Sequence, residues 1–235
     1  ASNTIVAKVH SEYADKLEKA KGKDIEKVVK TIITESYKKH SRIIFNGNGY
    51  SKEWAKEAKK RGLANVLTTN ESLRTFTSKE VIQISKELGT LTKDELEARY
   101  FAYAERYVTQ LSIEARTLIE IATKDILPAA IKYTNIVGQN IETVSKYGKA
   151  FTKEQEELLK ELVTNINTLR LETKSLIKKI DKVAKESDIA KQSDLAASEL
   201  LTGIAALRKP CDELEKIVDR TIWPLPTYKD LLFFL

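Results

Sequence analysis

Methionine is absent from all 235 residues, cysteine occurs once, and glycine and proline occur only eight and four times. A chain without methionine has no initiator residue, so the start Ala1-Ser2-Asn3-Thr4 is interpreted as a cut end and the chain as a fragment. The single cysteine, Cys211, excludes an intramolecular disulfide framework and favours a reducing, cytoplasmic environment. One cysteine and two widely separated histidines also leave a zinc site without its usual ligands. No metal or cofactor is therefore expected in this chain.

Long hydrophobic runs are missing as well. No apolar stretch approaches the roughly 20 residues that span a bilayer, and no signal-peptide pattern opens the chain. Hydrophobic residues make up 42% of the sequence and charged residues 31%, which is typical of a globular protein rather than a disordered one. We therefore expect no membrane partner, and a chain long enough for one large core or two smaller ones.

The net charge of +6 is distributed unevenly. Residues 1–65 hold 15 Lys and Arg against 8 Asp and Glu, whereas the rest of the chain holds 25 against 26. A basic N-terminal third is compatible with phosphate or nucleic-acid binding. However, its lysines alternate with acids at i,i+4, as in Glu12/Lys16 and Glu26/Lys30, which is typical of a solvated helix face. The second interpretation is favoured.

Apolar residues recur at helical spacing along most of the N-terminal part. One helix is predicted from about residue 5 to Gly22, and another over 25–40. A glycine-rich segment follows, and then three short helices. We expect Ser51 to cap the first of these, and Asn70 and Ser78 to cap the other two. Gly62 is expected to end the first short helix and Gly89 the last one.

The C-terminal part is predicted to contain long helices. Thr92-Lys93-Asp94-Glu95 and Thr152-Lys153-Glu154-Gln155 each match a capping box, with threonine before the helix and Glu or Gln three residues later. Pro128 and Pro210 are expected to kink their helices. A stripe close to a 3.5-residue repeat follows the second box, consisting of Leu158, Leu162, Ile166, Leu169, Thr173, Leu176, Ile180 and Val183.

The predicted fold class is all-α, a bundle of long antiparallel helices with a shorter-helix N-terminal part. The predicted regions are 1–91, with the short helices and the Asn-Gly-Asn-Gly loop, 92–222, with the long-helix bundle, and 223–235, a docking tail. All three are expected to form one structural unit. The extended tail carries the Trp-Pro-x-Pro motif, whose prolines prevent the last helix from continuing. Its large apolar residues are expected to dock on the bundle or on another subunit: Trp223, Leu225, Tyr228, Leu231 and Phe233.

Few residues suggest chemistry. The loop Asn46-Gly47-Asn48-Gly49 exposes backbone N–H groups, as a phosphate cradle does, but it lacks the Lys-Ser/Thr of a P-loop. A structural loop with two left-handed glycines is favoured, held in the core by the preceding Ile43-Ile44-Phe45.

The other titratable candidates have structural explanations too. Glu114 lies on an apolar stripe and Asp125 lies one turn before Pro128, and a paired core acid, with Arg116 or Arg99 as the partner, explains them better than catalysis does. Cys211 is expected to be a small core residue. The two histidines, His10 and His40, are expected at the surface.

Several stretches of the sequence are distinctive when taken together. They are Ser2-Asn3-Thr4-Ile5-Val6-Ala7, the block from Lys39 to Ser51 with Trp54, Lys60-Arg61-Gly62-Leu63, Lys124-Asp125-Ile126-Leu127-Pro128-Ala129, Asp212-Glu213-Leu214-Glu215 and Trp223-Pro224-Leu225-Pro226-Thr227-Tyr228. These stretches resemble one family, the type III glutamine synthetases, which are large ATP-dependent glutamate–ammonia ligases of bacteria. The resemblance covers essentially the whole chain, in order and with similar spacing.

This resemblance implies the C-terminal part of such a ligase. In the family, the Asn-Thr-Ile-Val-Ala segment follows an Arg-Phe-Glu-Phe-Arg run that reads glutamate and metal, and that run is absent from this sequence. The resemblance therefore transfers no catalytic residue and no ligand for the parent enzyme's ATP or Mg²⁺. It implies a helical region that accompanies a catalytic barrel in a ring-shaped homo-oligomer. Its partners would be the rest of the ligase chain or other subunits.

Two classes of function remain open from the sequence. In the first, the chain is the non-catalytic portion of a ligase and supplies an assembly or regulatory surface. In the second, it is a free-standing or engineered helical interaction module without enzymatic activity. The length of the parent polypeptide separates the two.

Overall fold

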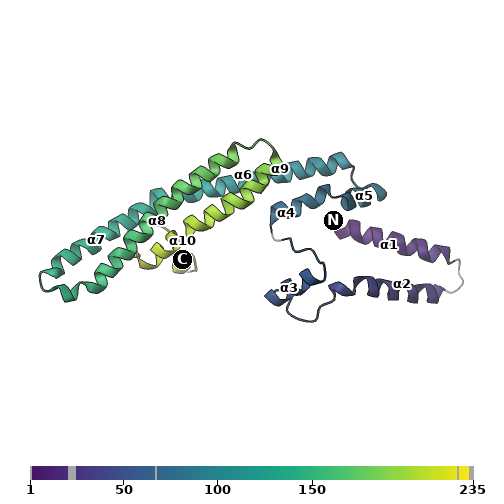
Figure 1. The fold of residues 1–235 in the computed structure, drawn as a ribbon, viewed down its shortest axis with the longest axis horizontal. Coiled ribbons are helices and arrows are strands. Elements are labelled where there is room, and N and C mark those ends of the chain that lie inside the picture. Colours follow the sequence, from purple (N-terminus) through teal and green to yellow (C-terminus); the bar gives the residue numbers. More distant parts are fainter. Residues whose placement is uncertain (1, 21–24, 67, 227, 233–235) are drawn as a thin grey trace. The chain divides into compact units, whose positions relative to one another are not determined.

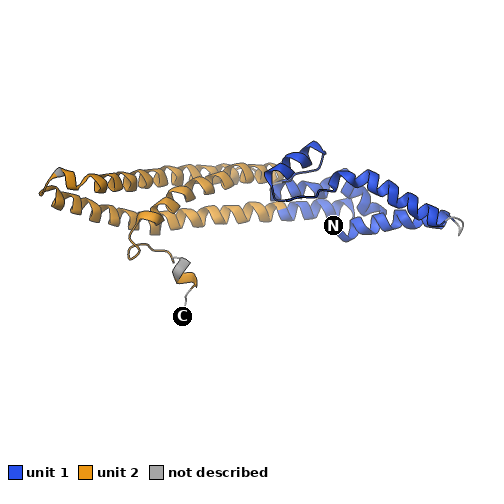
Figure 2. Ribbon diagram, turned by 90° about the horizontal axis from the view of Figure 1, so that it is seen from below, with its two compact units in different colours: residues 1–103 blue, residues 104–235 orange. Residues whose placement is uncertain are grey.

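The structure is a computed structural model that describes residues 2–20, 25–66, 68–226 and 228–232. Across these residues it is helical and contains no strand, which confirms the predicted all-α class (Figure 1). None of the described helices is long and apolar enough to cross a membrane. The chain divides into two compact units, residues 1–103 and 104–235 (Figure 2). This division falls inside one long helix, whereas the sequence suggested a boundary at the start of that helix.

The described residues of unit 1 form five α-helices and the beginning of a sixth. They are α1 (Ser2–Lys19), α2 (Ile25–His40), α3 (Lys52–Lys60), α4 (Thr69–Leu73), α5 (Lys79–Glu87) and the first part of α6 (Lys93–Ile121). Polar contacts join the first helices, because the hydroxyls of Tyr13 and Ser36 lie 2.7 Å apart and Lys16 donates to Glu35 at 2.9 Å. Apolar burial is sparse here. No described residue of α1 is buried, and Ile32 is the only buried one of α2.

The short helices of unit 1 begin mostly where the sequence predicted. The Ser51 hydroxyl accepts the Trp54 N–H at 3.2 Å, and the Ser78 hydroxyl accepts the Val81 N–H at 3.3 Å. The prediction for Asn70 was wrong, because Asn70 lies inside α4. That helix is capped by Thr68, whose extended backbone lets its hydroxyl accept the Glu71 N–H at 3.2 Å.

Unit 2 is built on long helices. The end of α6 passes through a π-helical turn, Ala122–Ile126, into α7 (Leu127–Ser145). After a turn of 3₁₀ helix the chain continues as α8 (Lys153–Ala184), α9 (Ile189–Leu195), a second π-helical turn, Ala196–Leu200, and α10 (Leu201–Ile217). Helix α8 packs against both α7 and α10. The sequence predicted a kink at Pro128. The structure has the first π-helical turn just before this proline, and this turn changes the backbone hydrogen bonds of the residues with which the proline ring would clash in a regular α-helix.

The core of unit 2 confirms the stripe predicted on α8. Leu162, Leu169, Leu176 and Val183 are at most 1% exposed, and Leu200, Leu207 and Leu214 are fully buried. The backbones of α10 and α8 come close at Gly203, where an added β-carbon would lie 2.7 Å from Cδ1 of Leu176. Helix α10 continues through Pro210, which is itself buried.

The two predicted capping boxes have opposite outcomes. At the start of α6 the box is confirmed, since the Glu95 N–H donates to the Thr92 hydroxyl at 3.2 Å and the Thr92 N–H donates to the Glu95 carboxylate at 2.8 Å. At the start of α8 it was wrong. Thr152 has a near-helical backbone, and its buried hydroxyl donates to Glu156 at 2.6 Å rather than capping the helix.

Candidate functional site

The predicted docking tail is only partly packed on unit 2. Trp223 is 9% exposed and belongs to the apolar core, and Leu225 is half-buried against it. The chain is not helical at Pro224 and Pro226, as expected, but it forms a short helix, α11 (Tyr228–Leu232), where an extended tail was predicted. An ion pair between Arg220 and Asp230, at 2.7 Å, connects this helix to the segment that follows α10.

Leu231 and Leu232, the last described residues of the tail, are not covered by this chain. Leu231 is 67% exposed and Leu232 is 72% exposed. Leu231 is therefore not buried on its own bundle, which was one of the two docking surfaces predicted for it. Helix α11 is held by the ion pair of Asp230, and its two leucines are exposed. Phe233 lies outside the described residues, and so does the side chain of Tyr228. Docking of these residues on another subunit stays a prediction.

The loop Asn46-Gly47-Asn48-Gly49 is ordered by side chains rather than by left-handed glycines. Neither Gly47 nor Gly49 has a positive φ, so neither glycine is one of the left-handed residues predicted for this loop. Gly47 is required for space instead, because a β-carbon there would lie 2.7 Å from Cζ of Phe45. The Asn48 carboxamide oxygen accepts the Tyr50 N–H at 3.0 Å and closes the turn.

The residues before the loop do not enter the core as expected. Ile43 is 59% exposed and Ile44 is 46% exposed. Only Phe45 packs, and it stacks on Trp54 of α3 with ring centroids 4.3 Å apart. The stack holds the loop against α3, and the two isoleucines face solvent.

Arg61 holds this segment together through several contacts. The sequence suggested no such structural role for it. Its guanidinium donates to the carbonyls of Ile44, at 2.8 Å, and Arg42, at 3.3 Å. It also pairs with Glu57 at 2.8 Å and lies 5.6 Å from the centre of the Trp54 ring. The signal was present in the spacing, because Trp54, Glu57 and Arg61 recur at i, i+3 and i+7 and share one face of a helix.

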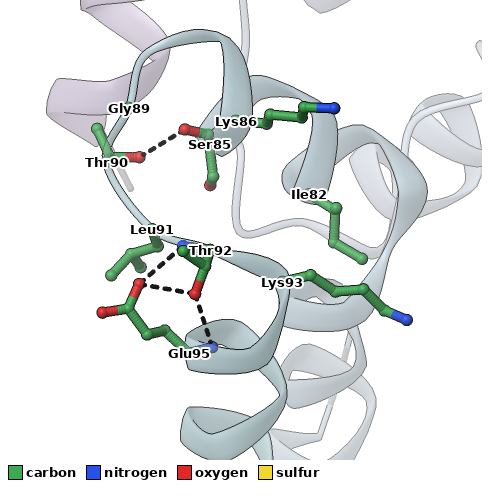
Figure 3. A pocket seen from close by; sticks show the side chains of 9 residues that line it. All are labelled: Ile82, Ser85, Lys86, Gly89, Thr90, Leu91, Thr92, Lys93 and Glu95. Atoms are coloured by element: carbon green, nitrogen blue, oxygen red, sulfur yellow. Dashed lines mark hydrogen bonds between the residues drawn. The ribbon is translucent and has the colours of Figure 1, made fainter.

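A pocket of about 400 Å³ lies between α5 and the start of α6 (Figure 3). Its polar groups are already used to cap α6. Hydrogen bonds from the backbone N–H and the hydroxyl of Thr92 lower the pKa of the Glu95 carboxyl below its ordinary value. The Thr90 hydroxyl reaches the Ser85 carbonyl at 3.4 Å. Glu95 is therefore a structural carboxylate whose hydrogen bonds favour its ionised form, and the residues that line the pocket include neither histidine nor cysteine.

The remaining titratable candidates are not brought together. Glu114 is exposed and accepts from Gln110 at 2.9 Å, so the prediction of a paired core acid was wrong there, and Asp125 is exposed as well. His10 and His40 lie at the surface, as predicted. No group of three metal-binding side chains occurs among the residues that the structure describes.

Cys211 is buried, as predicted, and desolvation, with a smaller contribution from Asp212, raises the pKa of its thiol to about 11. Three polar atoms of unit 2 are buried without a hydrogen-bond partner among the described residues, namely Tyr107 Oη, Gln155 Oε1 and Trp223 Nε1. Burial, followed by the nearby Glu114 charge, raises the pKa of Tyr107.

Comparison with known proteins gives consistent results. A family model described as the glutamine synthetase C-terminal domain matches residues 28–145. The type-3 glutamine synthetase of Dictyostelium discoideum is 29% identical over 207 residues, which cover 86% of this chain and 28% of that protein. A glutamine synthetase of Bacteroides fragilis is 31% identical over 245 residues, with coverage of 99% and 33%. One of Butyrivibrio fibrisolvens is 28% identical over 221 residues, with coverage of 94% and 32%. The chain thus spans about a third or less of the length of these relatives.

Proposed function

Because this chain belongs to the glutamine synthetase C-terminal domain family, we propose that it is the non-catalytic C-terminal portion of a type III glutamine synthetase and serves assembly or regulation. The parent reaction is the ATP-dependent ligation of ammonia to glutamate, with Mg²⁺ as the metal. The observation that carries the proposal is the extent of the similarity, which covers 86–99% of this chain and only 28–33% of each relative.

The geometry supports a role in assembly rather than in chemistry. The pocket beside α6 uses Glu95 and Thr92 for capping, and the acids Glu114 and Asp125 are exposed. Exposed apolar side chains, in contrast, occur on both units, among them Ile33, Tyr50 and Leu231. Apolar residues that cannot be buried within a chain are typical of surfaces that another protein covers.

We further infer that the long helices of unit 2 run antiparallel and that the tail completes its docking on another subunit of a cytoplasmic, bacterial homo-oligomer. Trp223 and Leu225 would anchor the tail to its own bundle, and Tyr228, Leu231 and Phe233 would reach the neighbour. Fully burying one apolar side chain stabilises a contact by about 1.5–3 kcal/mol. The outer tail residues would therefore add substantially to an existing subunit contact.

An activity assay and a mass measurement test the proposal. The purified chain should show no glutamate-dependent phosphate release and no γ-glutamyl transfer, before or after addition of ATP and Mg²⁺. The native polypeptide should have about three times the mass of this chain, as its relatives do. Turnover that survives chelation and contamination controls would contradict the non-catalytic role. A native polypeptide of this chain's own length would support a free-standing interaction module instead.

A further inference from the structure

The segment 38–61 of unit 1 combines a rigid loop, exposed apolar residues and a concentrated positive charge. It runs from the end of α2 through the Asn-Gly-Asn-Gly loop to the end of α3. It contains eight Lys and Arg against two Asp and Glu, an excess equal to the net charge of +6 of the whole chain. The charge of the protein is therefore concentrated on one local structure, which we call the basic loop surface.

The cations of this surface are mostly available to a partner. Arg61 pairs with Glu57 and binds two backbone carbonyls, so it is committed to holding the loop. The other seven have no carboxylate within ion-pair distance among the described residues, and all of them are exposed: Lys38, Lys39, Arg42, Lys52, Lys56, Lys59 and Lys60. Like charges that lie this close repel one another, and an acidic partner would relieve that repulsion.

Apolar side chains stand among these cations. Tyr50 has an exposed fraction of 101%, and Tyr37 at the end of α2 is 65% exposed. The loop that presents Tyr50 is preorganised, because Asn48 closes its turn and Phe45 stacks on Trp54. A rigid aromatic residue within a charged rim is typical of an anchor at a protein–protein interface, and preorganisation lowers the entropy lost on binding.

Two of the aromatic residues here are not available to stack on the bases of a nucleic acid. Proteins that bind single strands stack bases on free aromatic faces, whereas Phe45 and Trp54 stack on each other and Arg61 lies over the Trp54 ring. Tyr50 and Tyr37 remain as free rings. The partner is therefore taken from the larger polypeptide to which this chain is proposed to belong, and the experiment below includes a single-stranded oligonucleotide.

We propose that the basic loop surface binds an acidic protein face with an apolar pocket for Tyr50, located on the part of the parent ligase that this chain does not include. This inference rests on the proposed function. Complementary charge requires an acidic partner, and the rest of this chain is close to neutral overall, because residues 66–235 hold 25 Lys and Arg against 26 Asp and Glu. The relatives contain at least twice as much further polypeptide as this chain, which is where such a face would lie.

Hydroxyl-radical footprinting of Tyr50 tests the proposal. In the isolated chain Tyr50 should be oxidised at the rate of a free tyrosine, and in the full-length parent enzyme that rate should fall several-fold. The double charge reversal Lys56→Glu/Lys60→Glu in the parent should restore most of the exposure, because it replaces attraction by repulsion. A matched reversal on unit 2, Lys132→Glu/Lys174→Glu, changes two exposed lysines that are not part of the basic loop surface and should leave Tyr50 covered.

The outcomes separate this inference from the proposed function. A parent with ligase activity whose Tyr50 stays as reactive as in the isolated chain would overturn the docking proposal and leave the function intact. Protection that appears only after addition of a single-stranded oligonucleotide would also overturn it, in favour of nucleic-acid binding. A native polypeptide without a ligase region would contradict both the proposed function and the docking proposal.

Discussion

The ring of Phe45 occupies the space that a side chain at position 47 would need. A β-carbon on Gly47 would lie 2.7 Å from the ring, whereas one on Gly49 would meet nothing within 4 Å. We expect Gly47→Ala to push Phe45 off Trp54 and to lower the free energy of unfolding by about 1 kcal/mol, the usual contribution of an aromatic pair. Gly49→Ala should change it by less than about 0.5 kcal/mol. Urea unfolding and the near-ultraviolet circular dichroism of Trp54 measure both variants. Equal effects of the two substitutions would contradict the steric explanation.

The buried thiol of Cys211 should be unreactive in the folded protein. Burial raises its pKa from 9.0 to about 11, so almost no thiolate exists at pH 8. We expect alkylation by iodoacetamide to be slow until urea unfolds unit 2. Because the folded pKa lies above the unfolded one, this group's contribution to stability is complete below pH 9 and is lost as the pH rises toward 11. In the variant Cys211→Ala, the free energy of unfolding should decline less between pH 9 and pH 11. Fast alkylation of the native protein would contradict the burial of the thiol.

Two glycines inside long helices provide a matched pair of substitution sites that tests how closely the helices pack. Gly203 of α10 faces α8, and a β-carbon there would lie 2.7 Å from Leu176 and 3.1 Å from Lys179. Gly138 of α7 has open space around it. We expect Gly203→Ala to destabilise unit 2 by about 1–3 kcal/mol through overpacking. Gly138→Ala should stabilise it by about 0.5–1 kcal/mol, because alanine favours the helix. Thermal unfolding measures both. Stabilisation by Gly203→Ala would mean that α8 and α10 are not in close contact.

The beginnings of the helices depend on single side chains, and some of these were predicted correctly. At Ser51 and Ser78 an extended residue directly precedes a helix, so the hydroxyl reaches the N–H three residues later. The Thr92 hydroxyl likewise accepts the Glu95 N–H. Thr152 has the same sequence signal, but a preceding turn of 3₁₀ helix gives it a near-helical backbone. The motif therefore indicates a helix start, and the conformation of the residues before it decides whether the cap forms.

At the scale of the whole molecule, the tail should contribute to stability or to association. Trp223 is buried in the core of unit 2, and removing a large core aromatic residue costs about 3–5 kcal/mol. We expect deletion of residues 223–235 to lower the melting temperature by several degrees, to dissociate an oligomer, or both. Calorimetry and light scattering separate these results. A truncated chain that keeps its melting temperature and its mass would show that the tail is a free peptide.

Helical class, the stripe on α8 and the family resemblance followed from local pattern alone. Side chains at i, i+3 and i+4 share a face in any α-helix, so the buried residues Leu162, Leu169 and Leu176 are marked by spacing. The loop could not be derived in this way. Its arrangement depends on Arg61, which reaches back 17 residues to the Ile44 carbonyl, and on the stacking of Phe45 on Trp54. Helical spacing places Trp54 and Arg61 on one face of a helix, but no periodic signal shows that either residue contacts the segment before the loop.

The sequence by itself determined that the chain is helical, where most helices begin, and to which family it belongs, because these depend on local spacing and on stretches of similar residues. Only the tertiary structure decided which apolar residues are covered. Trp223 and Leu231 are both large apolar residues of one tail, yet the first is 9% exposed and the second 67%. The difference arises because burial depends on what lies opposite a side chain, and the neighbours that cover Trp223 come from distant parts of unit 2.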